Sequence, residues 1–359
     1  MRVLKRGIDL NANPVIDTSF LWSLHEFDSI KYGPLSKDLS EEQHELISQY
    51  WGRYTSNYDY KWVQFYYQRT GDFDVRYIPH EIYYSIIDRF LNPPHKATGL
   101  DDKRLYHQLF PTISQPDNLI IKAGGLLLTN TRKPVLANEA FDICKSKGKV
   151  VCKEPVYSCG GHGVELLVLP NDEERLIELL NDRSNDYIFQ EYICQHRDLQ
   201  SFHPKSVNTI RIITYLRENG EVVILSSVLR MGSNDSFVDN VSSGGCTCGI
   251  EDDGRLKPIG YSNELYKIKA HPNGETFIGK VVPSFKEVQS NATALHYSFP
   301  YFAILAWDFA IDENGKPVLI EVNMKNASID FMQLNNGPLF GEYTEEVLSR
   351  VFRNHFINF

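Results

Sequence analysis

Short apolar stretches with alternating polar positions follow one another from about residue 149 onward, separated by glycine-rich turns. This pattern predicts short strands joined by tight turns, with two helices expected near 171–182 and 342–355. Before residue 95 the chain is instead rich in aromatic residues and helix-compatible runs, and Ser40 with Gln43 resembles a helix-capping box. The mixture predicts an α+β fold preceded by a mainly helical N-terminal region.

The proline- and glycine-containing stretch at 92–99 is the best candidate for a linker after this helical region. We therefore expect one region over residues 1–95 and a second over 96–359. The second region begins with a helical stretch at 101–110, followed by short strands on either side of the pair Gly124-Gly125.

The stretch 306–323 reads as two apolar strands that are interrupted by acidic and amide side chains. Its dipeptide Asn314-Gly315 is the preferred centre of a two-residue type I′ turn. Counted along that register, Asp308 lies directly opposite Glu321. Two opposed carboxylates repel each other unless a positive charge lies between them.

A divalent cation would remove this repulsion. Asn323 falls on the same strand face as Glu321, because side chains alternate along a strand. Asp308, Glu321 and Asn323 all offer the hard oxygen ligands that Mg²⁺ prefers. The alternative is an amphipathic hairpin whose polar face simply meets water.

A second candidate for ligand binding is the stretch 149–169, which contains a strand ending in Lys153, a glycine-rich loop and another strand. Gly160, Gly161 and Gly163 would allow backbone amides to approach phosphate oxygens, and Lys153 would supply the countercharge. The loop lacks the Gly-Lys-Ser/Thr ending of a Walker A motif and leads into a strand, as the glycine-rich loop of protein kinases does. An ordinary hairpin with a solvated lysine remains the alternative.

Three further segments could complete a nucleotide pocket. The strand-like run at 187–193 could meet an adenine edge through its backbone, although an ordinary buried strand explains it equally well. Arg211 and Arg230 each interrupt an apolar strand, where an arginine either points into a cleft or faces solvent. Asn240 precedes a Gly-Gly turn that suits either a substrate-facing loop or a plain hairpin loop.

Composition narrows the classes of protein. Of the 359 residues, 42% are hydrophobic and 23% charged, and the net charge of -9 argues against a chain devoted to nucleic acid or acidic membranes. The N-terminal stretch lacks the apolar core of a secretory signal, and no stretch is apolar enough to span a bilayer. Six scattered cysteines fit reduced structural thiols better than a zinc site. We expect a cytoplasmic protein.

The order of these features resembles the ATP-grasp superfamily, most closely its sugar-transfer associated branch. The resemblance rests on "DDKRLYHQLF", "SVNTIRIITY", "VDNVSSGG" and "AWDFAIDENGKPVLIEVN", and it covers roughly residues 60–340. It implies two α+β subdomains that hold ATP between them, a nucleotide subdomain over about 120–195 and a metal and substrate subdomain over about 196–345. The residues that it implies for the nucleotide are Lys153, Gly160, Gly161, His162, Gly163, Gln190, Glu191 and Ile193.

The resemblance also implies Mg²⁺ binding by Asp308, Glu321 and Asn323, and catalytic roles for Arg211 and Arg230. The activity that it implies is an ADP-forming carboxylate–amine ligase that acts through an acylphosphate on a sugar or polysaccharide precursor. An amino-acid or peptide ligase, a phosphotransferase, and a non-catalytic nucleotide-binding scaffold in a glycan-assembly complex are the alternatives.

Two departures from the superfamily pattern concern the loop and the acceptor pocket. His162 stands where many ATP-grasp loops have lysine, which would make charge neutralisation there weaker or dependent on pH. The segment after Asn323 lacks the Pro-Gly turn of amino-acid ligases, so the acceptor pocket is open to interpretation. We expect Lys325 and Asn240 to contact the substrate.

Overall fold

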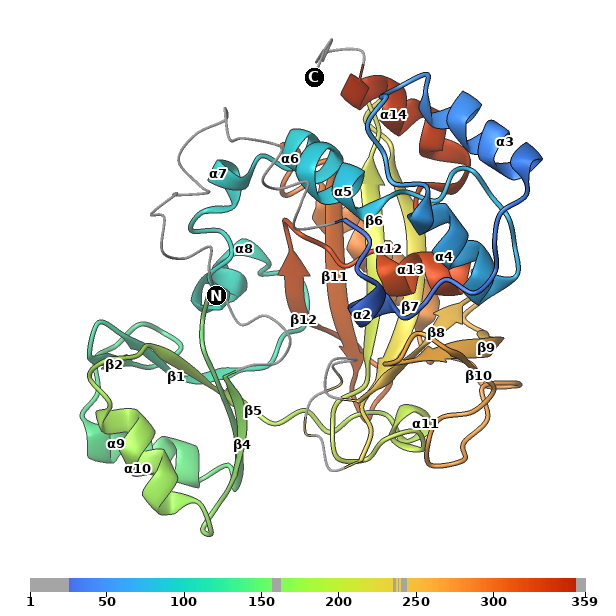
Figure 1. The fold of residues 1–359 in the computed structure, drawn as a ribbon. Helices are drawn as coiled ribbons and strands as arrows, with labels where there is room; N and C mark the ends of the chain where they lie inside the picture. Colours follow the sequence, from blue (N-terminus) through green and yellow to red (C-terminus); the bar gives the residue numbers. More distant parts are fainter. Residues whose placement is uncertain (1–25, 157–162, 235–236, 238, 240–243, 353–359) are drawn as a thin grey trace.

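A computed structural model describes residues 26–156, 163–234, 237, 239 and 244–352. Its first layer is a five-stranded antiparallel sheet with the order β2-β1-β5-β3-β4. The strands are β1 (Asn118–Ala123), β2 (Leu126–Leu128), β3 (Lys149–Lys153), β4 (Val164–Val168) and β5 (Tyr187–Glu191). Helices α9 (Ala137–Lys145) and α10 (Glu173–Asn181) cover one face of this sheet and share its hydrophobic core (Figure 1).

A second, seven-stranded antiparallel sheet has the order β10-β9-β8-β7-β6-β11-β12. Its strands are β6 (Thr209–Leu216), β7 (Val222–Met231), β8 (Cys246–Ile250), β9 (Leu256–Ser262), β10 (Lys267–Ile268), β11 (Ile304–Ile311) and β12 (Pro317–Asn323). Helix α12 (Phe285–His296) packs on one face. Helix α13 (Asp330–Asn336) packs on the other, together with the N-terminal region.

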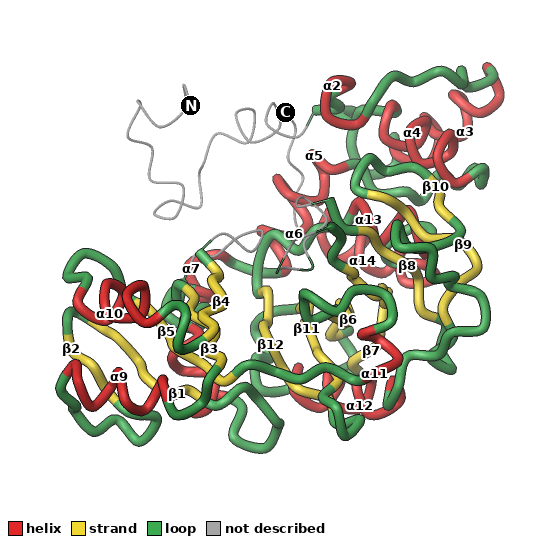
Figure 2. The backbone as a smooth tube through the Cα atoms, turned by 90° about the horizontal axis from the view of Figure 1, so that it is seen from below, coloured by secondary structure: helices red, strands yellow, loops and turns green. Residues whose placement is uncertain are grey.

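The N-terminal region is mainly helical, as the sequence predicts. It contains α2 (Ser29–Tyr32), α3 (Glu41–Trp51), α4 (Lys61–Thr70), α5 (His80–Ile82), the π-helix η2 (Tyr83–Ile87), α6 (Asp88–Leu91) and α7 (Pro94–Ala97). The predicted capping box is present, since the Ser40 side chain accepts from the Gln43 amide and the Gln43 side chain accepts from the Ser40 amide. Helices α2 to α6 share one core with the second sheet, and Figure 2 shows α3 and α4 at the end of the molecule away from the five-stranded sheet.

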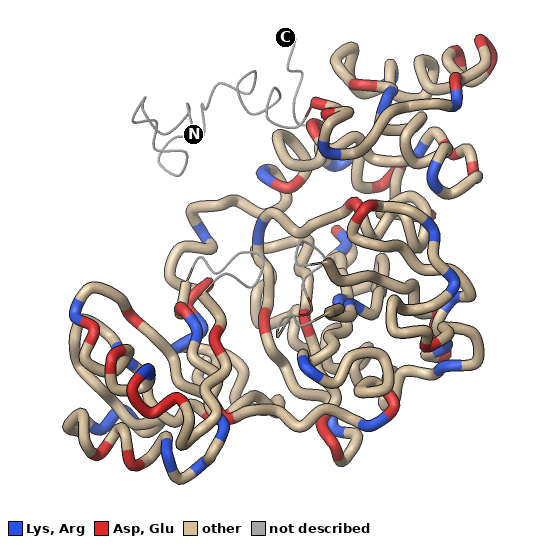
Figure 3. Tube along the Cα trace, turned by 60° about the horizontal axis from the view of Figure 1, so that its bottom comes forward, with Lys and Arg blue, Asp and Glu red and all other residues tan. Residues whose placement is uncertain are grey.

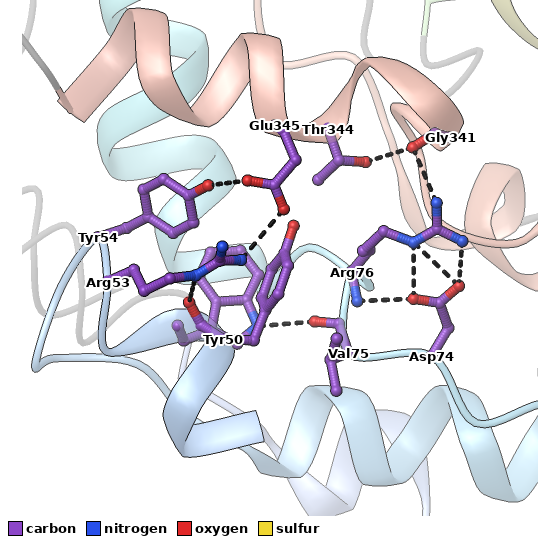
Figure 4. A network of polar contacts seen from close by, with 10 residues as sticks. Tyr50, Arg53, Tyr54, Asp74, Val75, Arg76, Gly341, Thr344 and Glu345 are labelled. Atoms are coloured by element: carbon purple, nitrogen blue, oxygen red, sulfur yellow. Dashed lines mark hydrogen bonds and ion pairs between the residues drawn. The ribbon is translucent and has the colours of Figure 1, made fainter. Parts of the chain in front are cut away.

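Polar contacts also fasten this region to the C-terminal helix α14 (Thr344–Phe352), which follows the short η6 (Gly341–Tyr343). Arg53 donates to Glu345 over 3.1 Å, and the Tyr54 hydroxyl donates to the same carboxylate (Figure 4). Arg76, held by Asp74, reaches the Gly341 carbonyl over 3.4 Å. These contacts join the segments that follow α3 and precede α5 to η6 and α14.

Short elements connect the two sheets. Helices η3 (Lys103–Leu105) and α8 (Tyr106–Leu109) precede β1, and α11 (Arg197–Gln200) follows β5. Among the described residues, no helix has the length and apolar composition that a bilayer span requires. Figure 3 shows basic and acidic residues interspersed over both sheets and their helices.

The hairpin formed by β11 and β12 differs from its prediction near the turn. Ile311 pairs with Pro317, and the Asp312 amide donates to the Lys316 carbonyl over 3.0 Å, so the predicted two-residue turn is wrong. A bulge next to Asp308 then shifts the register by one residue, and Asp308 does lie opposite Glu321. The facing pair is confirmed, although the turn from which it was counted is not.

Candidate functional site

A cavity of about 710 Å³ lies between the two sheets. The five-stranded sheet contributes β3, β4 and β5, and the second sheet contributes β6, β7, β11 and β12. The predicted site residues that line this cavity are Lys153, Gln190, Glu191, Ile193, Arg211, Arg230, Asp308, Glu321, Asn323 and Lys325. The structure therefore brings together residues from strands that are far apart in the sequence.

Asp308 is the centre of an ion cluster on the second sheet. Arg211 donates to both of its carboxylate oxygens, over 2.8 and 2.6 Å, and Arg230 donates to one of them over 3.2 Å. Only 3% of Asp308 is exposed, and burial alone would raise its pKa, but the two guanidinium groups hold the pKa below its usual value. The cluster forms because the three residues project from the same face of adjacent strands.

Asp239 extends this cluster toward the loop that follows β7. Its carboxylate accepts from the Thr209 hydroxyl and lies 3.8 Å from Arg230. Burial raises the pKa of Asp239, while Arg230 opposes that rise. Both arginines thus retain carboxylate partners and are held in place before any ligand binds.

Glu321 has a different partner, Lys103 of η3, whose ammonium lies 2.7 Å from its carboxylate. Lys103 is buried, and its backbone amide donates to the Pro155 carbonyl over 2.9 Å, which ties η3 to the end of β3. The sequence reasoning did not single out Lys103, although the lysine of the "DDKRLYHQLF" motif was the signal that could have identified it.

Lys153 faces the cavity from the end of β3, with 7% of its surface exposed. Burial, with a smaller contribution from the nearby Lys103, lowers the pKa of its ammonium to about 7, and Glu321 opposes the change. Among the described residues, no hydrogen-bond acceptor is close enough to hold the Lys153 ammonium. A buried cation of this kind is unstable by itself and is stabilised by an anionic ligand.

The strand β5 and its continuation form another wall. Gln190 is fixed by its side chain, which donates to Asn118 over 2.7 Å. The backbone amide of Glu191 donates to the Asp117 carbonyl over 3.0 Å, and its side chain is paired with Lys147. The residues after it, through Ile193, leave the sheet and line the cavity.

Of the remaining predicted residues, the structure describes Lys325 and Gly163. Lys325 lines the cavity and lies 3.6 Å from Asp101. Gly163, which opens β4, has a φ of +72°, and a Cβ there would come within 2.9 Å of the Glu154 side chain. Gly160, Gly161, His162 and Asn240 lie outside the described residues.

Hard oxygen donors suited to Mg²⁺ meet at one wall of the cavity. Asn323 lines the cavity beside Glu321, and its side-chain nitrogen is buried without a hydrogen-bond partner among the described residues. The described residues contain no group of three or more His, Cys, Asp or Glu side chains able to hold a metal. A Mg²⁺ ion here would therefore depend on Glu321 and Asn323, with Asp308 beside them, and on oxygens from a substrate.

Four of the described cysteines, Cys144, Cys152, Cys246 and Cys248, are buried, and Cys194 is exposed. Cys246 and Cys248 are buried in β8, and burial raises the pKa of both thiols to about 12. Neither thiol belongs to a metal-binding cluster among the described residues.

Two antiparallel sheets with a cavity between them are the arrangement of the ATP-grasp fold. A family model described as sugar-transfer associated ATP-grasp matches residues 85–347. The chain belongs to that family. No curated protein matches the sequence.

Several solved structures are similar in fold. One is the biotin carboxylase domain of Hydrogenobacter thermophilus 2-oxoglutarate carboxylase with MgADP, at 14% identity and a TM-score of 0.42 over 72% of this chain and 46% of that one. The ATP-grasp ligase PsnB has 11% identity and a TM-score of 0.42 over 72% and 64% of the two chains. D-cycloserine synthetase DcsG has 12% identity and a TM-score of 0.44 over 72% and 73%. This chain spans less than two thirds of the first two proteins.

Proposed function

We propose that the protein is a cytoplasmic ATP- and Mg²⁺-dependent carboxylate–amine ligase that forms an acylphosphate and modifies a sugar or polysaccharide precursor. The observation that carries the proposal is the composition of the cavity. Lys103 and Lys153 line it, Lys103 paired with Glu321, and Arg211 and Arg230 line it around Asp308. Such an arrangement suits a triphosphate and the charge that develops during phosphoryl transfer.

In this proposal the five-stranded sheet holds the nucleotide. Gln190, Glu191 and Ile193 would contact the adenine, and the Lys153 ammonium would bind phosphate oxygens. Lys103 would bind phosphate as well, because it lies between Glu321 and the end of β3. The amides around residues 160–163 would add to this cradle, with His162 as a pH-dependent cation.

The second sheet would hold the metal and the reacting groups. Glu321 and Asn323, with Asp308, would hold a Mg²⁺ ion that neutralises phosphate charge when it is bound. Arg211 and Arg230 would stabilise the transferring phosphoryl group, and Asp308 would keep their guanidinium planes in position. Asn240 and Lys325 are the proposed substrate contacts.

The reaction requires no nucleophile from the protein. A carboxylate oxygen of the acid substrate attacks the γ-phosphorus, the bond to the β–γ bridging oxygen breaks, and ADP leaves. The amine nitrogen then attacks the acyl carbon, the carbon–oxygen bond to phosphate breaks, and phosphate leaves together with one proton. Positioning and electrostatic stabilisation account for catalysis of this kind.

The sugar-related substrate is the finer part of the proposal and is supported by the family to which the chain belongs. We propose an amide between a uronic acid and an amino acid or amine as the product. Mass spectrometry of reactions with Mg-ATP, nucleotide-linked uronic acids and a pool of amino acids tests this. The expected product is heavier than the uronic acid by one amino acid minus water, and its formation releases ADP.

Other outcomes of the same experiment would replace the proposal. AMP and pyrophosphate as the nucleotide products would exclude an acylphosphate route. A phosphorylated sugar would identify a phosphotransferase, and ligation of amino acids to each other would identify a peptide ligase. Tight Mg-ATP binding with no turnover across the substrate panel would favour a nucleotide-binding scaffold in a glycan-assembly complex.

A further inference from the structure

The cavity extends beyond the arginine cluster to a second end, where the N-terminal region forms part of the wall. Tyr32 of α2 and Phe331 of α13 line this end, together with Leu265 from the turn between β9 and β10. Two charged residues, Lys31 and Asp330, line it as well. Helix α2 lies outside the range 85–347 that the family model matches, so this wall is an addition to the shared fold.

Asp330 is a carboxylate without a cationic partner in contact. One of its oxygens accepts from the Phe331 amide over 3.0 Å, and no ion pair joins it to a described lysine, arginine or histidine. Burial raises the pKa of Asp330, and Lys31 and Arg211 are close enough to oppose that rise. Asp330 therefore lies between the arginine cluster and the N-terminal wall, within electrostatic range of both.

Lys31 supplies the opposite charge. Its ammonium lies over the ring of Tyr32, 4.8 Å from the ring centre, and the residue is exposed to solvent. Lys31 influences Asp330 electrostatically, yet the two side chains make no ion pair. The two groups face one cavity without touching. A ligand that carries a negative group for Lys31 and a positive group for Asp330 would complement both.

The aromatic part of this wall is held rigidly. The hydroxyl of Tyr32 lies 3.4 Å from Nδ1 of His80, and the hydroxyl of Tyr66 lies 2.8 Å from Nε2 of the same ring. Trp62 stacks on His80 with ring centres 3.6 Å apart. Tyr32 is thus fixed by residues of α4 and α5, and the wall does not have to form when a ligand enters.

We propose that this end of the cavity is the acceptor subsite and that it takes a free amino acid, with the ammonium group on Asp330 and the carboxylate on Lys31. The inference rests on the proposed ligase activity and specifies its amine substrate. The ammonium must lose a proton before its nitrogen attacks the acyl carbon, and the Asp330 carboxylate receives that proton. The N-terminal helical region then selects the acceptor, while the two sheets carry out the phosphoryl transfer.

Ligand-observed NMR on the full chain with Mg-ADP tests the subsite without turnover. The probes are the twenty free amino acids, with alkylamines that lack the carboxylate and carboxylic acids that lack the amine. We expect saturation transfer to at least one amino acid and to neither partial probe, and a loss of affinity of at least about tenfold in Asp330→Asn, the size of a charge-assisted contact. Lys31→Gln should weaken the binding of the same amino acid.

The variants keep the test interpretable. An asparagine at position 330 still offers an oxygen to the Phe331 amide, so the start of α13 is preserved. Asp252→Asn is the matched control, because Asp252 is exposed and does not line the cavity. Two results would overturn the proposed subsite alone. One is binding of Mg-ADP without binding of any amino acid, and the other is equal affinity of wild type and Asp330→Asn for the amino acid. Failure to bind Mg-ADP would instead count against the proposed function.

Discussion

The two sheets present positive charge to the cavity in opposite ways. On the seven-stranded sheet, Arg211 and Arg230 are bound to Asp308, and this cluster is complete without a ligand. On the five-stranded sheet, Lys153 is buried with no acceptor among the described residues, and burial lowers its pKa to about 7. The arginines are thus held in place by protein carboxylates, whereas Lys153 has no such partner, and we propose that an anionic ligand supplies it.

A lysine on the opposite face of the five-stranded sheet is buried with a hydrogen-bond acceptor. Lys122 of β1 is also buried, but its ammonium donates to the Leu179 carbonyl over 2.6 Å and lies over the ring of Tyr187. Burial lowers the pKa of Lys122 too. The difference between the two lysines is the presence of an acceptor, which fits the proposal that Lys153 binds a ligand whereas Lys122 stabilises the fold.

The largest effect should follow from breaking the cluster around Asp308. Asp308→Asn leaves Arg211 buried without its paired carboxylate and removes one of the two carboxylates beside Arg230, and we expect it to lower the free energy of unfolding by about 3–5 kcal/mol. Urea denaturation measures this. The control is Asp253→Asn, which breaks the exposed pair with Arg255 and should cost less than about 1 kcal/mol. Similar losses in the two variants would contradict the account.

Lys153→Met tests the proposed binding of an anion. The dissociation constant for Mg-ATP should rise at least about tenfold, which corresponds to about 1.4 kcal/mol. The free energy of unfolding without nucleotide should stay the same or rise, because a buried cation without an acceptor has been removed. Lys149→Met, on the same strand but exposed, is the control. Equal weakening of binding in both variants would refute a specific role for Lys153.

The lowered pKa of Lys153 also predicts how stability depends on pH. Its pKa is about 7 in the folded protein against 10.5 for an ordinary lysine, so the unfolded chain binds more protons between these values. The free energy of unfolding without nucleotide should therefore rise with pH above about 7, by about 1 kcal/mol per unit. Urea denaturation at several pH values should show this slope in wild type and a smaller slope in Lys153→Met.

Lys122→Met should give the smallest effect. Loss of its bond to the Leu179 carbonyl should lower the free energy of unfolding by about 1 kcal/mol, with no change in affinity for Mg-ATP. Thermal unfolding and a nucleotide titration of the same sample measure the two quantities. A weakened affinity for Mg-ATP would mean that the two faces of the sheet are coupled.

Local patterns predicted much of the second sheet. Alternation along the strands and the Asn-Gly turn located the hairpin and the pair formed by Asp308 and Glu321. The turn itself was wrong, because the sequence does not show that Asp312 bonds to Lys316 or that a bulge follows Asp308. The turn shifts the strand pairing by one residue from the predicted register, and the bulge shifts it back at Asp308 and Glu321. The bulge also puts Leu319, and neither Val318 nor Ile320, in the core with Trp307.

Long-range placement could not be predicted in the same way. Helices α9 and α12 were not predicted. Their apolar residues form a recognisable buried face only when the sheets that they cover are known. Lys103 and Asp330 reach the cavity through tertiary packing, with no local motif that marks Asp330 as a site residue. The domain boundary near residue 95 and the roles of the site residues remain predictions.

The central claim is that the cavity between the sheets binds Mg-ATP through Lys153. Calorimetric titration of Mg-ATP near pH 8, in two buffers that differ in ionisation enthalpy, tests it most directly. At this pH the Lys153 ammonium is largely deprotonated in the free protein, and bound phosphate should raise its pKa again. The account predicts binding with proton uptake in wild type, and weaker binding without that uptake in Lys153→Met. No binding heat in wild type, or identical binding and uptake in the variant, would contradict it.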